Sequence, residues 1–313
     1  MKKKVIVFCI ALVILLGGCV GVGHYFVGYA LSPTSNSDQR NVEGEKEVSF
    51  DEESKYEDDI GDEFYKMTSQ TSILSQDGLH LVGHYVINEE SHLWTILIHG
   101  YKSNSQEMMS FAARYYNQHY NVLIPDNRAH GESEGNYIGM GWLDKNDIES
   151  WIDWILNQDH EAQIILHGVS MGGATTMMVS GDNPEHVIGY IEDCGYTSVW
   201  DIFSSELKKR FGLSTFPVLD ISNLYAQCVA GYNFKEASSL LQVEKCEKPM
   251  LFIHGDLDDF VPTEMVYELY DVAQCPKELY VVEGAGHAQS KVKDVQAYWD
   301  KVFTFIDNQI LNH

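Results

Sequence analysis

Basic residues are scarce in this sequence. It holds 21 lysines and arginines against 46 aspartates and glutamates, for a net charge of −25. Such an excess of negative charge repels nucleic-acid phosphates, so we expect no nucleic-acid partner. Prolines are also few, seven among 313 residues, while 44% of the residues are hydrophobic. The chain is therefore long and apolar enough to bury a large core, either as two domains or as one large domain with appendages.

Metal-binding and redox motifs are missing as well. The six cysteines form no C-x-x-C pair, which argues against a zinc site or a dithiol redox centre. The acidic stretches contain no calcium loop of the pattern D-x-[DN]-x-[DN]-G. Four cysteines lie beyond the apolar N-terminus, where we expect buried thiols or an optional disulfide whose connectivity the sequence leaves open: Cys194, Cys228, Cys246 and Cys275.

The N-terminus combines three lysines, at residues 2–4, with an apolar stretch over residues 5–31. About 20 apolar residues suffice for a helix to cross a bilayer, and flanking positive residues stay on the cytoplasmic side. We therefore expect residues 1–31 to be a single-pass anchor in the cell membrane, with the catalytic part outside. The alternative is a lipoprotein signal, because residues 16–19 resemble a lipobox ending at Cys19. We favour the uncleaved anchor, since the apolar stretch continues past that cysteine.

Two further regions follow the N-terminal stretch, and the second contains an insertion. Residues 32–65 are acidic and poor in large apolar residues, so we expect a solvated linker. Over residues 66–313, short apolar runs alternate with helical periodicities, which predicts a mainly parallel, doubly wound α/β sheet. About residues 200–245 the alternation is interrupted, as by an inserted cap. The expected strands are 71–75, 79–87, 95–98, 121–125, 163–166, 187–191, 250–253 and 278–282.

One motif points to chemistry directly. The segment Gly168–Gly172 has the pattern G-x-S-x-G, with Ser170 at its centre, and follows the expected strand 163–166. A serine at a tight turn between strand and helix adopts strained dihedral angles, which requires small neighbours and lifts the hydroxyl clear of the sheet. Ser170 is therefore the candidate nucleophile of an acyl-transfer reaction.

Such a nucleophile needs an acid and then a base further along the chain, each after a strand. His287 follows the last expected strand on a glycine-rich loop, and an imidazole can take up the proton of the serine hydroxyl. The loop after strand 250–253 offers several aspartates. We choose Asp258 as the acid that orients the imidazole, with Asp256 as its competitor.

The oxyanion that develops during acyl transfer needs hydrogen-bond donors held in position. Two backbone amides are the candidates. The amide of Met171 comes directly after the nucleophile, and the amide of Tyr101 lies in the turn after strand 95–98. The residues that bind the rest of the substrate are not apparent from the sequence.

Five segments of the chain resemble the α/β-hydrolase superfamily, and the resemblance covers nearly all of residues 66–313. The patterns D-x-R-x-H-G-x-S-x-G and H-G-x-x-D-x-x-V-P are similar to those of prolyl-oligopeptidase-like and acyltransferase-like esterases, which occur as membrane-anchored proteins in Gram-positive bacteria. The resemblance implies serine hydrolysis with Ser170, Asp258 and His287 as the triad. The segments are His99–Tyr101, Asp126–Gly135, Gly168–Gly172, His254–Pro262 and Gly284–His287.

We therefore expect a membrane-tethered serine hydrolase that cleaves a small-molecule carboxylic ester or thioester through an acyl-serine intermediate, with no cofactor and no metal. A serine peptidase acting on short peptides is the nearer rival, because the same groups cleave amides. A catalytically silent surface-binding protein is the second, although three triad residues kept without chemistry would be a coincidence. A dehalogenase would need a carboxylate where Ser170 stands.

Overall fold

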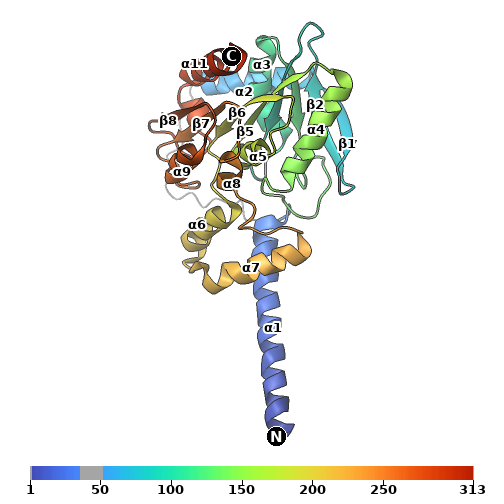
Figure 1. The fold of residues 1–313 in the computed structure, drawn as a ribbon, viewed down its shortest axis with the longest axis vertical. Coiled ribbons are helices and arrows are strands. Elements are labelled where there is room, and N and C mark those ends of the chain that lie inside the picture. Colours follow the sequence, from blue (N-terminus) through green and yellow to red (C-terminus); the bar gives the residue numbers. More distant parts are fainter. Residues whose placement is uncertain (1, 36–51, 313) are drawn as a thin grey trace.

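The computed structural model describes residues 2–35 and 52–312 (Figure 1). An eight-stranded sheet with the order β1-β2-β4-β3-β5-β6-β7-β8 lies at its centre. β2 is antiparallel to both of its neighbours, whereas β3 to β8 are parallel, as predicted for a mainly parallel α/β sheet. The strands are β1 (Ser69–Leu74), β2 (His80–Val86), β3 (Leu93–Ile98), β4 (Asn121–Pro125), β5 (Gln163–Val169), β6 (Val187–Asp193), β7 (Met250–Gly255) and β8 (Lys277–Val282).

Helices cover both faces of this sheet, which is why its central strands are mostly apolar on both faces. Ile96 and Ile98 of β3 belong to a core with α4, α5 and α9, while Leu97 belongs to a second core with α3 and α11. Successive side chains of one strand thus enter two different cores. The helices on the sheet are α3 (Met109–Asn117), α4 (Asp144–Gln158), α5 (Met171–Ser180), α9 (Glu264–Val272) and α11 (Val295–Phe305), with the short helices η2 (Ser105–Met108), α10 (Ser290–Lys293) and η3 (Ile306–Leu311).

Helix α2 (Glu52–Tyr65) corrects the expectation that residues 32–65 form a solvated linker. Phe64 is buried in the core beside α3, and the side chain of Glu57, 2% exposed, pairs with Arg114 and Lys291. Glu57 and Phe64 lie two helical turns apart on one face, so a buried ion pair and an apolar contact hold an otherwise acidic helix on the domain. Residues 36–51 of the expected linker lie outside the described residues.

Between β6 and β7, in the region expected to form a cap, the chain forms α6 (Val199–Phe211), α7 (Thr215–Val229) and α8 (Ser239–Val243). α6 and α7 lie at one end of the domain, next to α1, and we call them the cap helices (Figure 1). α8 instead packs against α5 and α9, so it belongs to the layer of helices on the sheet.

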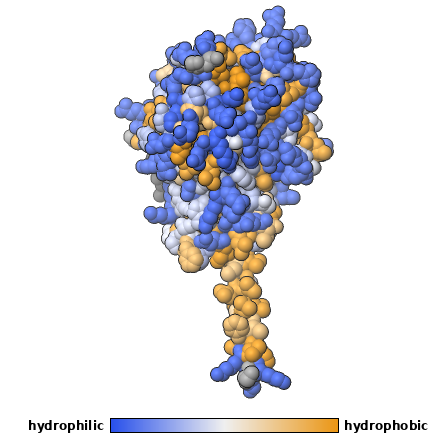
Figure 2. All heavy atoms as spheres, viewed as in Figure 1, coloured by the Kyte–Doolittle hydropathy of each residue, from blue (hydrophilic) through white to orange (hydrophobic). Residues whose placement is uncertain are grey.

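Helix α1 (Lys2–Leu31) has two halves with different surroundings. Its first half projects from the domain with apolar side chains exposed, and by length and composition the helix can cross a membrane (Figures 1 and 2). In the second half, Val27 and Leu31 are buried against the domain. α7 crosses α1 so closely that a Cβ on Gly23 would overlap the side chain of Tyr225. The sequence did not lead us to expect this docking.

The domain also forms hydrogen bonds with backbone carbonyl groups at the end of α1. The last carbonyl groups of a helix have no partner within the helix and need one outside it. The hydroxyl of Tyr101 donates to the carbonyl oxygen of Ala30 at 2.6 Å, and the N–H of Ile138 donates to that of Leu31 at 2.8 Å. The end of α1 is therefore a part of the folded domain.

Candidate active site

Ser170 lies in the tight turn between β5 and α5 that its sequence pattern predicts. Its backbone has φ 57° and ψ −116°, a conformation that residues other than glycine rarely adopt. The neighbouring glycines make the turn possible. A Cβ on Gly168 would overlap the carbonyl oxygen of Gly172, and a Cβ on Gly172 would overlap that of Ile98. The sequence thus fixes a strained turn with the serine hydroxyl at the end of the sheet.

The three side chains predicted to form a triad lie in a chain of hydrogen bonds. Oγ of Ser170 is 2.8 Å from Nε2 of His287, and Nδ1 of His287 is 2.7 Å from Oδ2 of Asp258. All three residues are buried. When Nδ1 donates its proton to the carboxylate, Nε2 remains as the acceptor for the hydroxyl proton of Ser170. This arrangement suits a nucleophile, a base and an orienting acid.

The structure separates the two aspartates that competed for the role of acid. Asp258 is buried and contacts His287. Asp256 is exposed, and its Oδ1 accepts from the N–H of Gly284 at 2.6 Å, so it holds the loop that carries the histidine. Asp256 therefore supports the loop, and Asp258 has the geometry of the acid.

Donors surround the carboxylate of Asp258. Its Oδ1 accepts from the N–H groups of Phe260 and Val261, both at 2.9 Å, and its Oδ2 lies 3.3 Å from Nε2 of His254 in addition to His287. Burial alone would raise the pKa of Asp258. The hydrogen bonds and charges of the two imidazoles outweigh burial, so the pKa lies well below its usual range. The group is therefore an ionised acceptor. We had not singled out His254 as a partner of this acid.

The two candidate oxyanion donors belong to different segments near Ser170. The amide of Met171 follows Ser170 in the chain, and the amide of Tyr101 lies in the loop after β3. Met171 is the first residue of α5, where an N–H has no acceptor within the helix. The loop that contains Tyr101 runs beside Ser170, because a Cβ on Gly100 would lie 3.5 Å from the Cβ of Ser170. Both amides thus belong to segments next to the hydroxyl.

Two buried histidines hold the Tyr101 loop. Nε2 of His99 accepts from the N–H of Asn127, and Nε2 of His130 accepts from the N–H of Lys102, each at 3.0 Å. Burial lowers the pKa of His99 to about 3 and lowers that of His130 as well. Both rings are therefore neutral, so an unprotonated nitrogen can accept these bonds. The loops after β3 and β4 are in this way fixed to each other beside Ser170.

The thiol of Cys194 lies next to the triad and, like a carboxylate and an imidazole, is a group that can bind a metal ion. Its Sγ and the ligand atoms of Asp258 and His287 all lie within 4.8 Å of one another, a grouping that could in principle hold a metal ion. Burial raises the pKa of the Cys194 thiol well above its usual value, and both ring nitrogens of His287 are already in hydrogen bonds. A metal would need a thiolate and an open nitrogen, so these groups suit the triad better.

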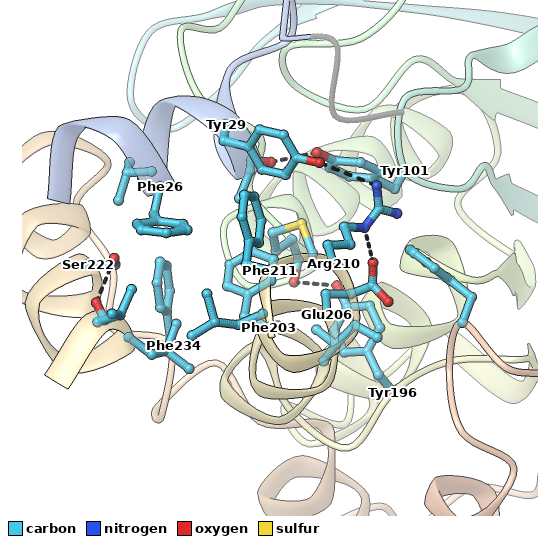
Figure 3. Close-up of a pocket in the computed structure, with 18 of the residues that line it drawn as sticks. Phe26, Tyr29, Tyr101, Tyr196, Phe203, Glu206, Arg210, Phe211, Ser222 and Phe234 are labelled. Atoms are coloured by element: carbon cyan, nitrogen blue, oxygen red, sulfur yellow. Dashed lines mark hydrogen bonds and ion pairs between the residues drawn. The ribbon is translucent and has the colours of Figure 1, made fainter. Parts of the chain in front are cut away.

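An apolar pocket of about 90 Å³ lies next to Ser170 (Figure 3). This volume is several times the ~10–15 Å³ that one water needs, so the pocket is large enough to hold an apolar group. Glu206 and Arg210 supply its charged lining, and they pair with each other. The other walls are mainly apolar and come from the end of α1 (Phe26, Val27, Tyr29, Ala30), from α6 (Ile202, Phe203, Leu207, Phe211) and from α7 (Val218, Leu219).

Comparisons with known proteins show the family to which this fold belongs. The model of a protein family described as "Serine aminopeptidase, S33" matches residues 90–212. The Bacillus subtilis protein YqkD is 30% identical over 253 residues, which cover 80% of this chain and 83% of YqkD. The chain belongs to the α/β-hydrolase superfamily. Its membership agrees with the strand order and with the turn that carries Ser170, and it supports a hydrolase.

Solved α/β-hydrolase structures share this fold. An esterase of Pyrococcus furiosus matches with a TM-score of 0.64 and 23% identity, over 77% of this chain and 92% of the esterase. The acylaminoacyl peptidase of Pyrococcus horikoshii matches with a TM-score of 0.59 and 18% identity, over 78% of this chain and 41% of the peptidase. One fold thus carries both activities, and the bond that this α/β-hydrolase cleaves depends on its own site.

Proposed function

We propose that this protein is a serine hydrolase that cleaves carboxylic esters, or thioesters, through an acyl-serine intermediate. The observation that carries the proposal is the hydrogen-bonded sequence from Ser170 through His287 to Asp258, next to an apolar pocket. The pocket suits an acyl chain, and the hydroxyl beside it suits attack on the carbonyl carbon of that chain.

The reaction has two halves. His287 takes the proton of Ser170 as Oγ attacks, and the amides of Met171 and Tyr101 stabilise the negative oxygen of the tetrahedral intermediate. The ester C–O bond then breaks, and His287 gives its proton to the leaving alcohol. In the second half His287 activates water, which attacks the acyl-enzyme and releases the acid. Asp258 keeps the imidazole in the required tautomer throughout.

A serine aminopeptidase acting on short peptides is the second candidate. The family description "Serine aminopeptidase, S33" favours it, as does the fold shared with an acylaminoacyl peptidase. An aminopeptidase needs a carboxylate for the ammonium group of its substrate. Glu206, the carboxylate among the lining residues, pairs with Arg210 through Oε2, while its buried Oε1 has no hydrogen-bond partner among the described residues. We rank the ester first because the rest of the lining is mainly apolar, which suits the uncharged acyl group of an ester.

A substrate panel separates the two activities. The full chain in detergent is assayed on p-nitrophenyl esters of increasing chain length and on aminoacyl p-nitroanilides. We expect kcat/KM for the best ester to exceed that for the best anilide by at least about 100-fold, because most of the pocket lining is apolar and suits an acyl chain better than an ammonium group. The opposite order would identify a peptidase. Failure of a fluorophosphonate to label the protein, while it labels an active hydrolase, would favour the silent binding protein.

We also propose that α1 anchors the chain in the cell membrane with the hydrolase domain on the outer side. The three N-terminal lysines and the exposed apolar half of α1 support this orientation. The lipobox-like residues ending at Cys19 leave cleavage and lipidation as the alternative. We expect the intact mass of the chain purified from membranes to include residues 1–18. A mass lacking them, with lipid added, would establish the lipoprotein.

A further inference from the structure

The end of α1 is a wall of the pocket beside Ser170. Phe26, Val27, Tyr29 and Ala30 all line it, within the last two turns of the helix (Figure 3). The ring of Phe26 meets that of Phe211 on α6 edge to face, with centroids 5.2 Å apart. The helix that we propose to enter the membrane therefore also forms one wall of the pocket.

The length of α1 fixes where this pocket lies relative to a bilayer. About 20 residues of helix cross the hydrocarbon region, so a span that begins after Lys4 ends near His24. α7 crosses α1 at this level, where it contacts Gly23. The lining residues of α1 follow directly, from Phe26 onward. The pocket thus lies just beyond the end of the span.

The end of the domain that carries α6 and α7, which we call its base, has exposed apolar side chains, as a surface beside a bilayer would. Leu213, Phe216 and Leu224, in and before α7, are 39%, 75% and 65% exposed, so this end of the domain presents large apolar side chains near α1. Apolar residues continue from α1 onto this base in Figure 2. A cap helix that lies across the span with exposed apolar side chains suits the interface between headgroups and acyl chains.

Three residues of the pocket wall are only partly buried: Phe26 of α1, Phe211 of α6 and Val218 of α7. Their exposure is consistent with an entrance between these three helices. An acyl chain that enters between these helices passes from the apolar interior of the bilayer into the apolar pocket, with no transfer through water. If the pocket opened into the aqueous phase, it would have to bind long acyl chains from water, where their concentration is very low.

From these observations we infer that the substrate is a membrane lipid in which a long-chain fatty acid is esterified to an alcohol. This lipid reaches Ser170 from the bilayer, between α1 and the cap helices. The inference rests on the proposed serine hydrolysis. Oγ of Ser170 forms a bond to the acyl carbon as the bond to the lipid alcohol breaks, and His287 transfers the serine proton to that alcohol. Water then releases the fatty acid.

Chain-length selectivity tests the wall formed by α1. The full chain is reconstituted in phosphatidylglycerol vesicles and assayed on 4-methylumbelliferyl palmitate in the bilayer and on the acetate in water. We expect Ala30→Phe, which fills the pocket from α1, to lower the palmitate-to-acetate ratio of kcat/KM at least about tenfold. Val20→Phe places the same side chain at a position of α1 that is 57% exposed and does not line the pocket, and it should leave the ratio unchanged. An equal ratio in both variants overturns the inference.

A covalent probe tests the same wall in the unmodified protein, whether or not the filled variant folds. A fluorophosphonate with a photoreactive diazirine near the end of a long alkyl chain binds Ser170 with loss of fluoride, and illumination then joins the chain to its neighbours. We expect cross-links to residues 26–30 of α1. Labelled Ser170 with cross-links only outside α1 contradicts the lipid route but leaves serine hydrolysis intact. Absence of labelling at Ser170, together with no activity on the acetate, contradicts the proposed function itself.

Discussion

Replacement of Ser170 by alanine is expected to lower kcat/KM for p-nitrophenyl butyrate by at least about 10⁴-fold, because the acyl-enzyme can no longer form. His287 and Asp258 would remain hydrogen-bonded to each other at 2.7 Å, and the pocket would still bind the ester. The loss should therefore appear in kcat with little change in KM. Steady-state kinetics in detergent measure both, and loss of fluorophosphonate labelling locates the nucleophile.

The matched control is Ser150→Ala on α4, where the hydroxyl donates to the carbonyl oxygen of Asn146, at 3.1 Å, and to no residue of the triad. This variant should keep its activity and its labelling. A Ser170→Ala protein that retained a tenth or more of the wild-type rate, after purification from a host lacking other esterases, would mean that another group is the nucleophile.

The second large effect is expected for Asp258→Asn. An amide cannot accept both from the imidazole and from the N–H groups of Phe260 and Val261 as a carboxylate does, so it favours the tautomer with the proton on Nε2 of His287. A histidine in that tautomer cannot take the proton of Ser170. We expect kcat to fall by about 10³- to 10⁴-fold, measured on the same ester.

Asp256→Asn is the control, since the two aspartates lie in one loop but have different partners. Asp256 accepts from the N–H of Gly284, and an asparagine carbonyl can replace it there. This variant should keep a kcat near that of the wild type. If Asp256→Asn were the slower of the two enzymes, the acid would have to be reassigned to Asp256.

The sequence was sufficient to predict the sheet and the order of the site residues. β4 has the bounds 121–125 that its apolar run predicts, because a strand buried on both faces has a continuous apolar sequence with a sharp end. The candidate triad could be found for a related reason. Each of its residues follows a parallel strand, and the carboxyl ends of parallel strands meet at one edge of a sheet.

Two features could not be predicted, and each depends on a partner that is distant in the chain. α2 looks like a spacer by composition, and only the cations of Arg114 and Lys291 make the burial of Glu57 favourable. The end of α1 looks like part of a membrane span, because hydropathy does not distinguish lipid from an apolar protein surface. Its excess length over the ~20 residues of a span was the available signal.

The hydroxyl of Tyr101 has a consequence for work with shortened chains. This side chain is bonded to the carbonyl oxygen of Ala30, while its backbone lies in the loop beside Ser170. The loop beside Ser170 and helix α1 are therefore connected through the side chain and the backbone of one residue. A soluble version that starts after Leu31 would lose that tether and one side of its binding space together, so an inactive fragment would say little about the intact enzyme.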